Sequence, residues 1–125
     1  MTNPCLYIVM REDLWDLNPG KGMAQASHAT SDFENYEPLT GGIWDSLATW
    51  CEGRNFGTTI VLEAPINDFE RIAEATQHNG VVTDPTYPYR NYYGKLFTCS
   101  AVTCMWVFAT TDEEIEYMKQ WRLHQ

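Results

Sequence analysis

The stretch SAVTCMWVFA, residues 100–109, is apolar at every position after Ser100 except Thr103. A second segment, CLYIVM at residues 5–10, has the same character. Strands that are apolar on both faces are typical of sheets that are covered on both sides. These two segments therefore predict two inner strands of a sheet, with helices packed on each face.

The rest of the chain supplies the helices and the outer strands of this sheet. Amphipathic spacing and breaker residues predict helices at residues 21–36, 43–52, 67 to about 77 and 111 to about 123, and further strands at 58–64 and 81–84. The order is β-α-α-β-α-β-β-α. It predicts an α/β fold in which residues 1–125 form a single domain around a mixed four-stranded sheet with helices on both faces.

Two helix starts carry the signature of a capping box, in which a side chain at the start of the helix and an acid three residues later satisfy backbone N–H groups. Asn67 with Glu70 is one such pair, and Thr111 with Glu114 is the other. We expect the third and fourth helices to begin at these pairs.

The composition excludes several classes of protein. Hydrophobic residues make up 44% of the 125 positions, which excludes wholesale disorder, and no apolar run approaches the ~20 residues of a membrane span. The first residues lack the features of a signal peptide, which predicts a cytoplasmic protein. The 17 acids against 8 bases give a net charge of −9, which counts against DNA and requires a local basic patch for any RNA partner.

The 4 cysteines form no CxxC pair and no zinc-like cluster with histidine. They are interpreted as reduced, mostly buried thiols. No metal site is predicted.

The segment LNPGKGMAQASHATSDF, residues 17–33, places polar side chains along one line of a helix. Lys21, Gln25, His28 and Asp32 follow one another at helical spacing. A separate arc is predicted to face the core, and it comprises Met23, Ala26, Ala29, Thr30 and Phe33. The polar line is therefore a candidate functional surface.

Lys21 lies in the first turn of this helix, where unpaired N–H groups and the helix dipole already favour an anion. A lysine there opposes helix stability but suits the binding of a phosphate or a carboxylate. The alternative is a solvated lysine that follows a turn. His28 has two interpretations: it is either a general base or an ordinary hydrogen-bonding residue.

Within this segment PGKGMAQASHA, residues 19–29, resembles the Gly-Lys-x-x-x-Gln-x-x-His-Ala signature of the type-2 peptidyl-tRNA hydrolases. VMRED at 9–13 resembles the end of that family's first strand, and VVTD at 81–84 resembles the strand that carries its aspartate. TCMWVFATTDEEIEYM at 103–118 is similar to the closing strand and the acidic helix start. The resemblance covers nearly the whole chain, although only the first motif is specific.

The resemblance implies hydrolysis of the ester that joins a peptide, or an N-blocked amino acid, to tRNA, by a homodimer that uses no cofactor. By this resemblance, the catalytic positions of the family correspond to Lys21, Asp84 and Thr103. The substrate-binding positions, which include candidates from a tyrosine-rich segment after Asp84, are Gln25, His28, Thr86, Arg90, Tyr92 and Lys95. The tRNA acceptor end that carries the peptide is the implied partner.

The segment after Asp84 departs from the family pattern. Pro88 replaces a threonine four residues after the aspartate, and the distance from Asp84 to Thr103 is longer. The inserted residues interleave tyrosines with Arg90 and Lys95 in an apparent loop, and no acid lies between Asp84 and Asp112. Such a segment suits stacking on exposed bases. Alternatively, its tyrosines pack on the sheet or on a dimer partner.

Two other functions stay open at this point. The departures favour a non-catalytic module on the same fold that holds an RNA end or a protein. A small hydrolase of another acyl ester is the third reading. Trp15, in the loop before Lys21, is a further candidate for a residue that lines the site.

Overall fold

In the computed structural model, the two apolar segments form the middle of the sheet. β1 (Cys5–Arg11) and β4 (Leu96–Ala109) lie antiparallel to each other. β2 (Thr59–Ala64) runs parallel to β1 at one edge, and β3 (Asn79–Arg90) runs antiparallel to β4 at the other. The strand order β2-β1-β4-β3 confirms the predicted mixed four-stranded sheet. The structure describes residues 3–15, 17–36, 42–52, 57–90 and 93–124.

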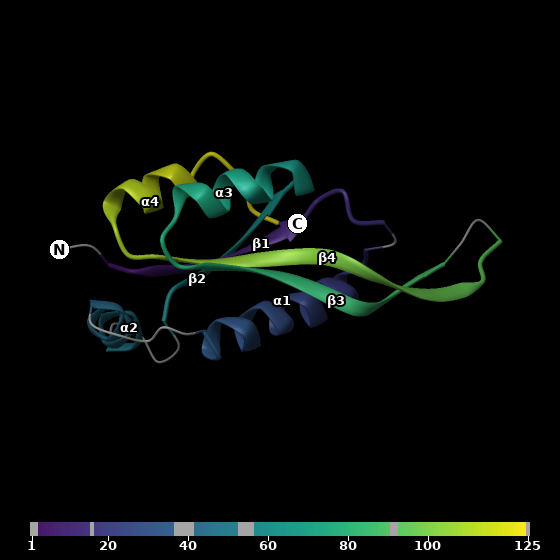
Figure 1. Ribbon diagram of the computed structural model, residues 1–125, viewed down its shortest axis with the longest axis horizontal. Coiled ribbons are helices and arrows are strands. Elements are labelled where there is room, and N and C mark those ends of the chain that lie inside the picture. Colours follow the sequence, from purple (N-terminus) through teal and green to yellow (C-terminus); the bar gives the residue numbers. More distant parts are fainter. Residues whose placement is uncertain (1–2, 16, 37–41, 53–56, 91–92, 125) are drawn as a thin grey trace.

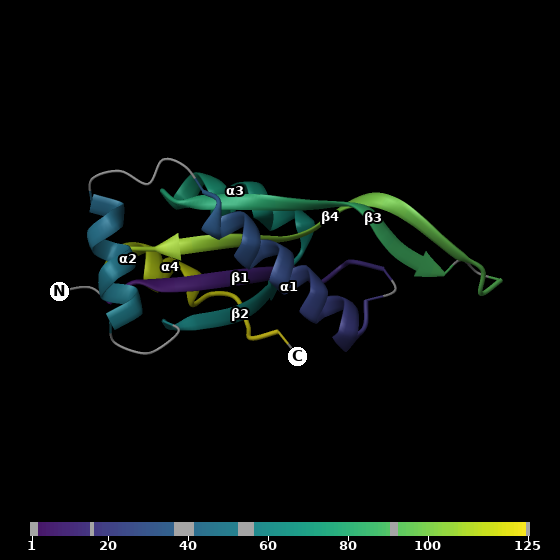
Figure 2. The same ribbon diagram turned by 90° about the horizontal axis from the view of Figure 1, so that it is seen from below.

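Helices cover both faces of this sheet, as predicted (Figure 1). α1 (Pro19–Glu34) and α2 (Gly42–Glu52) lie on one face, which Figure 2 shows from below. α3 (Phe69–Ala75), which follows the short 3-10 turn η1 (Ile66–Asp68), lies on the other face with α4 (Asp112–Met118). The element order confirms a single α/β domain.

Alternating side chains of the inner strands fill two cores. Tyr7 and Val9 of β1 belong to the cluster under α3 and α4, whereas Leu6 and Ile8 belong to the cluster under α1. In the second cluster Phe33 packs against the ring of Trp106, with the two ring centres 5.1 Å apart. The two-residue period of a strand explains how one apolar strand supplies both cores.

The pair β3–β4 continues beyond the rest of the sheet. β1 pairs with β4 only as far as Met10 opposite Cys104, while β3 pairs with β4 out to Arg90 opposite Leu96. This two-stranded extension projects from the body of the domain (Figures 1 and 2). The prediction of a short strand at 81–84 followed by a loop was therefore wrong. β3 runs through Pro85 and Pro88, which an edge strand tolerates because it has no partner on its outer side.

The pairing of β3 with β4 changes register at two places. One shift lies between Val82 and Thr83, where the paired residues on β4 jump from Cys104 to Val102 and leave Thr103 as the extra residue. The other lies between Asp84 and Tyr87. Bulges of this kind re-aim side chains and are frequent beside functional sites.

Four local predictions differ from the structure. The last helix, predicted to run to about Leu123, ends at Met118, and Leu123 instead forms a bridge with β2. α1 begins at Pro19 rather than at Lys21, because Asn18 caps it and proline suits the first helical position. Asn67 and Glu70 form no capping box, because the chain enters α3 through η1 and no side chain caps either turn. Met23 is not a core residue: its side chain is 70% exposed.

The helix start at Thr111 was predicted correctly. The Thr111 hydroxyl accepts a hydrogen bond from the backbone N–H of Glu114 at 3.2 Å. The Glu114 carboxylate accepts in return from Thr110 and, at 2.8 Å, from the N–H of Gln77. Glu114 thus joins α4 to the chain that leads into β3.

The residues after α4 return along the outer side of β2. Leu123 forms an antiparallel bridge with Leu62. The N–H of Glu63 donates to the carbonyl of Arg122 at 3.0 Å, and the N–H of His124 donates to the carbonyl of Val61 at 2.9 Å. The outer edge of β2 is therefore hydrogen-bonded along this stretch.

The four cysteines carry free thiols, of which Cys5 and Cys104 are buried, Cys99 is half-buried and Cys51 is exposed. The prediction of mostly buried thiols holds for Cys5 and Cys104. Among the described residues, no helix combines the length and the apolar character that crossing a bilayer requires.

Candidate active site at the start of helix α1

The first turn of α1 directs Lys21 toward the base of the β3–β4 extension. The Asn18 side chain accepts a hydrogen bond from the backbone N–H of Lys21 at 2.9 Å, which fixes the start of the helix. The Lys21 ammonium lies 5.5 Å from the centre of the Tyr87 ring, in the range of a cation–π contact. No acidic residue occupies the first turn, so the positive end of the helix and the lysine add to one another.

Gln25, one turn later, joins the helix to both strands. Its Nε2 donates a hydrogen bond to Oδ2 of Asp84 at 2.8 Å, and its Oε1 accepts one from the Thr103 hydroxyl at 2.7 Å. Gln25 is 2% exposed and Thr103 is 0% exposed. The amide thus holds a partly exposed carboxylate and a buried hydroxyl in fixed positions.

Asp84 is held on its other oxygen by the residues that follow it. The N–H of Thr86 donates to Oδ1 at 2.9 Å, and the Thr86 hydroxyl lies 3.4 Å from the same atom. Partial burial raises the pKa of Asp84, but the hydrogen bonds from Gln25 and Thr86 and the electrostatic influence of His28 outweigh it. The net result is a pKa below the ordinary value of 3.8. Asp84 is therefore ionised at neutral pH.

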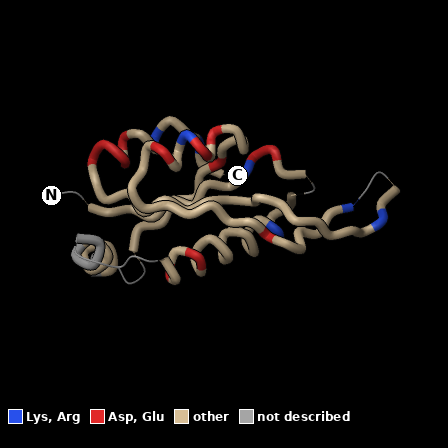
Figure 3. The backbone as a smooth tube through the Cα atoms, viewed as in Figure 1, with Lys and Arg blue, Asp and Glu red and all other residues tan. Residues whose placement is uncertain are grey.

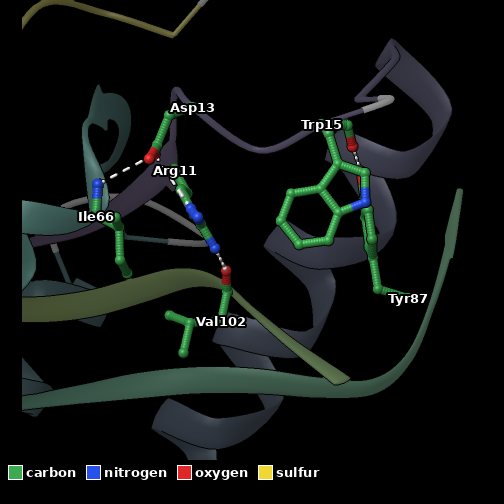
Figure 4. Close-up of polar contacts among 6 residues, drawn as sticks. All are labelled: Arg11, Asp13, Trp15, Ile66, Tyr87 and Val102. Atoms are coloured by element: carbon green, nitrogen blue, oxygen red, sulfur yellow. Dashed lines mark hydrogen bonds and ion pairs between the residues drawn. The ribbon is translucent and has the colours of Figure 1, made fainter. Parts of the chain in front are cut away.

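Polar contacts tie the loop after β1 to its neighbours (Figure 4). The guanidinium of Arg11 donates to the carbonyl of Val102 at 3.1 Å, next to Thr103. The Tyr87 hydroxyl donates to the backbone carbonyl of Trp15 at 2.8 Å. Asp13 accepts from the N–H of Ile66 at 3.1 Å, which ties the loop to η1. These bonds hold the Trp15 ring beside Tyr87 and Tyr89.

The structure brings together most of the residues predicted from the sequence. Hydrogen bonds join Gln25 with Asp84 and Thr103, and Thr86 with Asp84. Lys21 lies one turn before Gln25 on the same helix. His28 is exposed on the same line and acts on Asp84 electrostatically. Trp15, the further candidate from the sequence, contacts the base of the extension.

The remaining predicted residues lie elsewhere. Arg90 and Lys95 belong to the extension, where Arg90 donates to the carbonyl of Gly94 at 3.0 Å. Tyr92 lies outside the described residues. Asp32, the fourth residue of the polar line, accepts a hydrogen bond from the Trp106 indole at 2.7 Å and so anchors α1 to the sheet.

Tyr87 is a site residue that the sequence did not single out. It is 0% exposed, so the packing alternative for the tyrosine-rich segment is correct at this position. Its ring fills the space between the loop after β1 and β4, where it packs with Leu14 and Ala101. The alternation of apolar residues along a strand could have revealed it, if the segment had not been interpreted as a loop.

Two other features of the described residues bear on ligands. No three or more side chains of His, Cys, Asp and Glu gather there in a way that would hold a metal ion. A pocket of about 340 Å³ lies against a different face of α1, and its lining is Met10, Leu17, Pro19, Gly22, Met23, Ala26, Val61 and His124. Within the described chain, Nδ1 of His124 is buried and has no hydrogen-bond partner.

We expect Gln25→Leu to destabilise the fold by about 1–3 kcal/mol, because the buried Thr103 hydroxyl would lose its oxygen acceptor and keep only the weak acceptor Cys104 Sγ at 3.6 Å. Urea unfolding measures the loss. Adding Thr103→Val should recover part of it, since that hydroxyl is then absent. Ser27→Ala, at an exposed position of α1, is the matched control. Equal stabilities of Gln25→Leu and the control would contradict the bridging role of Gln25.

The lowered pKa of Asp84 predicts a specific acid sensitivity. Because the folded-state pKa lies below the unfolded value, ionised Asp84 stabilises the fold above the unfolded pKa, and this contribution is lost as the pH falls through the folded one. The free energy of unfolding, measured by urea melts between about pH 6 and pH 2.5, should therefore decline less steeply in Asp84→Asn than in the wild type. Equal slopes of unfolding free energy against pH in the two proteins would show that the hydrogen bonds to Asp84 do not lower its pKa.

Comparison with protein-family models finds none that matches the chain, and comparison with curated proteins finds no match either.

Proposed function

We propose that the chain is a hydrolase that cleaves the ester bond between a peptide, or an N-blocked amino acid, and tRNA. The observation that carries the proposal is the pair of hydrogen bonds by which Gln25 joins Asp84 and Thr103, one helical turn after Lys21. The resemblance implies these residues for the reaction. They lie far apart in the chain, and their closeness in the fold supports the proposal.

Asp84 positions the attacking water in this proposal. Its two oxygens already accept from Gln25 and Thr86, yet a carboxylate has about four acceptor sites, so a water molecule can also donate to it. The water oxygen attacks the ester carbonyl, and the bond from that carbon to the ribose oxygen breaks. The ribose oxygen leaves as a hydroxyl and the peptide as a carboxylic acid. Because the pKa of Asp84 is low, orienting the water is its main contribution.

Lys21 stabilises negative charge in the same step. Its ammonium extends from the positive end of α1, where the helix dipole acts in the same direction. A cation in that place stabilises either the oxyanion that forms on the carbonyl or a phosphate of the terminal nucleotide. The contact with the Tyr87 ring restricts where the lysine points.

Gln25 and Thr103 act as positioning residues. Both side chains are buried, so they hold Asp84 rather than touch the substrate. This assigns to Thr103 a different role from the catalytic one implied by the resemblance. The exposed side chains His28 and Thr86 flank Asp84 and are the ones available to the substrate.

The proposal carries three further expectations. The partner is the acceptor end of a tRNA that bears a peptide, and no cofactor is needed, because water, one carboxylate and one cation suffice for ester hydrolysis. The reaction places the protein in the cytoplasm. The resemblance also implies a homodimer, which light scattering of the purified protein tests directly.

Release of peptide from purified peptidyl-tRNA is the test of the proposed function. We expect multiple turnovers, with the tRNA product carrying a free 3′ hydroxyl. Aminoacyl esters without the N-terminal block and simple acyl esters, offered in parallel, separate this activity from that of a general esterase. Absence of turnover on every ester would contradict the proposal.

A non-catalytic RNA-binding module is the second candidate. The observation that favours it is that Thr103 is buried and hydrogen-bonded to Gln25, while Pro88 occupies the position of the family's other threonine. Binding of peptidyl-tRNA with an unchanged ester after prolonged incubation would support this candidate over the enzyme.

A further inference from the structure

A row of aromatic rings links the β3–β4 extension to the start of α1. We define the hairpin arm as residues 87–90 of β3 and residues 93–99, which lead into and form the first part of β4. On the arm the rings of Phe97 and Tyr89 stack with centres 5.9 Å apart and planes 27° from parallel. The Tyr89 ring meets Trp15 at 6.1 Å, and Trp15 meets Tyr87 at 6.1 Å. The row therefore runs without a gap from the arm to the body.

Cationic groups lie against these rings at both ends and in the middle of the row. The Lys95 ammonium is 5.4 Å from the centre of the Phe97 ring. The Arg11 guanidinium is 5.5 Å from that of Trp15, and Lys21 completes the series at Tyr87. We call the rings of Phe97, Tyr89, Trp15 and Tyr87, with these three cations, the aromatic track.

Charge is distributed unevenly over the molecule (Figure 3). Asp and Glu residues concentrate on α3, α4 and the segments beside them, whereas Lys and Arg mark the arm. No acid occurs from Pro85 to Thr111. A protein with a net charge of −9 thus keeps one extension on which a polyanion is not repelled locally.

The arm and the loop after β1 also expose aromatic surface. Tyr93 is 87% exposed, Trp15 is 42% exposed and Phe97 is 38% exposed. The arm has only two strands and stands out from the sheet, so it has little core of its own. Exposed rings on such a ribbon are poorly explained by stability and well explained by contact with a ligand.

We propose that the aromatic track binds the unpaired nucleotides of a single-stranded RNA and guides its 3′ end toward Lys21 and Asp84. Bases stack on the accessible faces of Phe97, Tyr89 and Trp15, and Lys95 and Lys21 contact the phosphates. The buried ring of Tyr87 supports Trp15 and Lys21 from below. The direction of the strand rests on the proposed function, whereas RNA binding by the arm does not. A nucleotide chain repeats a flat base and a phosphate with each residue, which suits a row of rings that has cations beside it.

A fluorescent single-stranded RNA of about eight nucleotides, without a peptide, tests the proposal by anisotropy at low salt. We expect Phe97→Leu to weaken binding about tenfold, because one stacking surface is lost. Lys95→Gln should reduce the slope of log K against log salt by about one, because one phosphate contact is lost. Leu96→Ala is the matched control, since neighbouring side chains on a strand point to opposite faces. Urea melts of each variant check that the fold is intact.

Equal affinity of Phe97→Leu and Leu96→Ala for the RNA, or no binding at low salt, would overturn the proposal. Tighter binding of a duplex than of the single strand would also overturn it. So would loss of self-association in Phe97→Leu by light scattering with RNA affinity unchanged, which would assign the arm to a second copy of the chain.

Failure of the proposed function gives a different pattern from failure of the track. If the oligonucleotide binds and Phe97→Leu weakens it, but no ester is hydrolysed, the track stands and the enzymatic assignment falls. If peptidyl-tRNA is hydrolysed and Phe97→Leu changes neither KM nor oligonucleotide affinity, the enzyme stands and the track falls. If both hold, Phe97→Leu raises KM and leaves kcat near the wild-type value.

Discussion

Asp84→Asn is expected to lower kcat for peptidyl-tRNA hydrolysis by at least about 100-fold. Asparagine keeps the size of the side chain and an oxygen that accepts from the N–H of Thr86. Its NH2 can donate to Oε1 of Gln25 once that amide turns over, so the local geometry should survive. What it loses is the negative charge that orients and polarises the attacking water. Single-turnover release of peptide from peptidyl-tRNA measures the chemical step without a contribution from product release.

The matched control for this variant is Asp32→Asn. Asp32 lies on the same line of α1, and asparagine can still accept the hydrogen bond from Trp106. We expect the control to keep nearly full activity. The acidic limb of the wild-type pH–rate profile should lie below the ordinary aspartate pKa of 3.8, because the hydrogen bonds from Gln25 and Thr86 lower the pKa of Asp84. Equal rates for Asp84→Asn and Asp32→Asn would rule out Asp84 as the catalytic carboxylate.

Lys21→Met is expected to reduce kcat/KM by about 100- to 1000-fold while leaving the fold almost as stable as before. Removal of a cation from the positive end of α1 gains stability, and loss of its contact with the Tyr87 ring costs a similar amount. The free energy of unfolding should therefore change by less than about 1 kcal/mol. A large kinetic effect with a small effect on stability is what a functional lysine produces.

The kinetic split for Lys21→Met distinguishes the two roles proposed for the lysine. A fall in kcat indicates that the ammonium stabilises the oxyanion, and a rise in KM alone indicates that it holds a phosphate. Lys119→Met, which removes a surface ion pair with Glu116, is the control and should leave both constants unchanged. Activity of Lys21→Met equal to that of Lys119→Met would leave the lysine as a solvated residue at a helix start.

Much of the fold follows from local patterns in the sequence. Two apolar runs identified the inner strands, and helical spacing with breaker residues gave the element order, because burial on both faces and one-sided burial leave different periodicities. Lys21 and Gln25 were correctly placed on one line of α1. The same periodicity misplaced Met23, because it gives the spacing of side chains on a helix and not the angle at which the helix meets the sheet.

The geometry around Asp84 and Thr103 depends on pairing between strands, which a local pattern does not encode. Two prolines made residues 85–90 resemble a loop, although an edge strand accommodates them. The bulge at Thr103 arises from the register between β3 and β4, and it decides that this hydroxyl meets Gln25 rather than solvent. Sequence reasoning found both residues but could not foresee that one of them is sealed.

The two rims of the sheet limit how copies of this chain can assemble. Along β2, the returning residues Arg122 to His124 already occupy backbone groups that a neighbour's strand would need. Along β3, Pro85 and Pro88 have no backbone N–H to donate to a neighbour's strand. Neither rim is suited to strand addition, so intermolecular β-pairing is disfavoured on both sides. A dimer of this protein is therefore expected to bring side-chain surfaces together, and not to extend one sheet into the next.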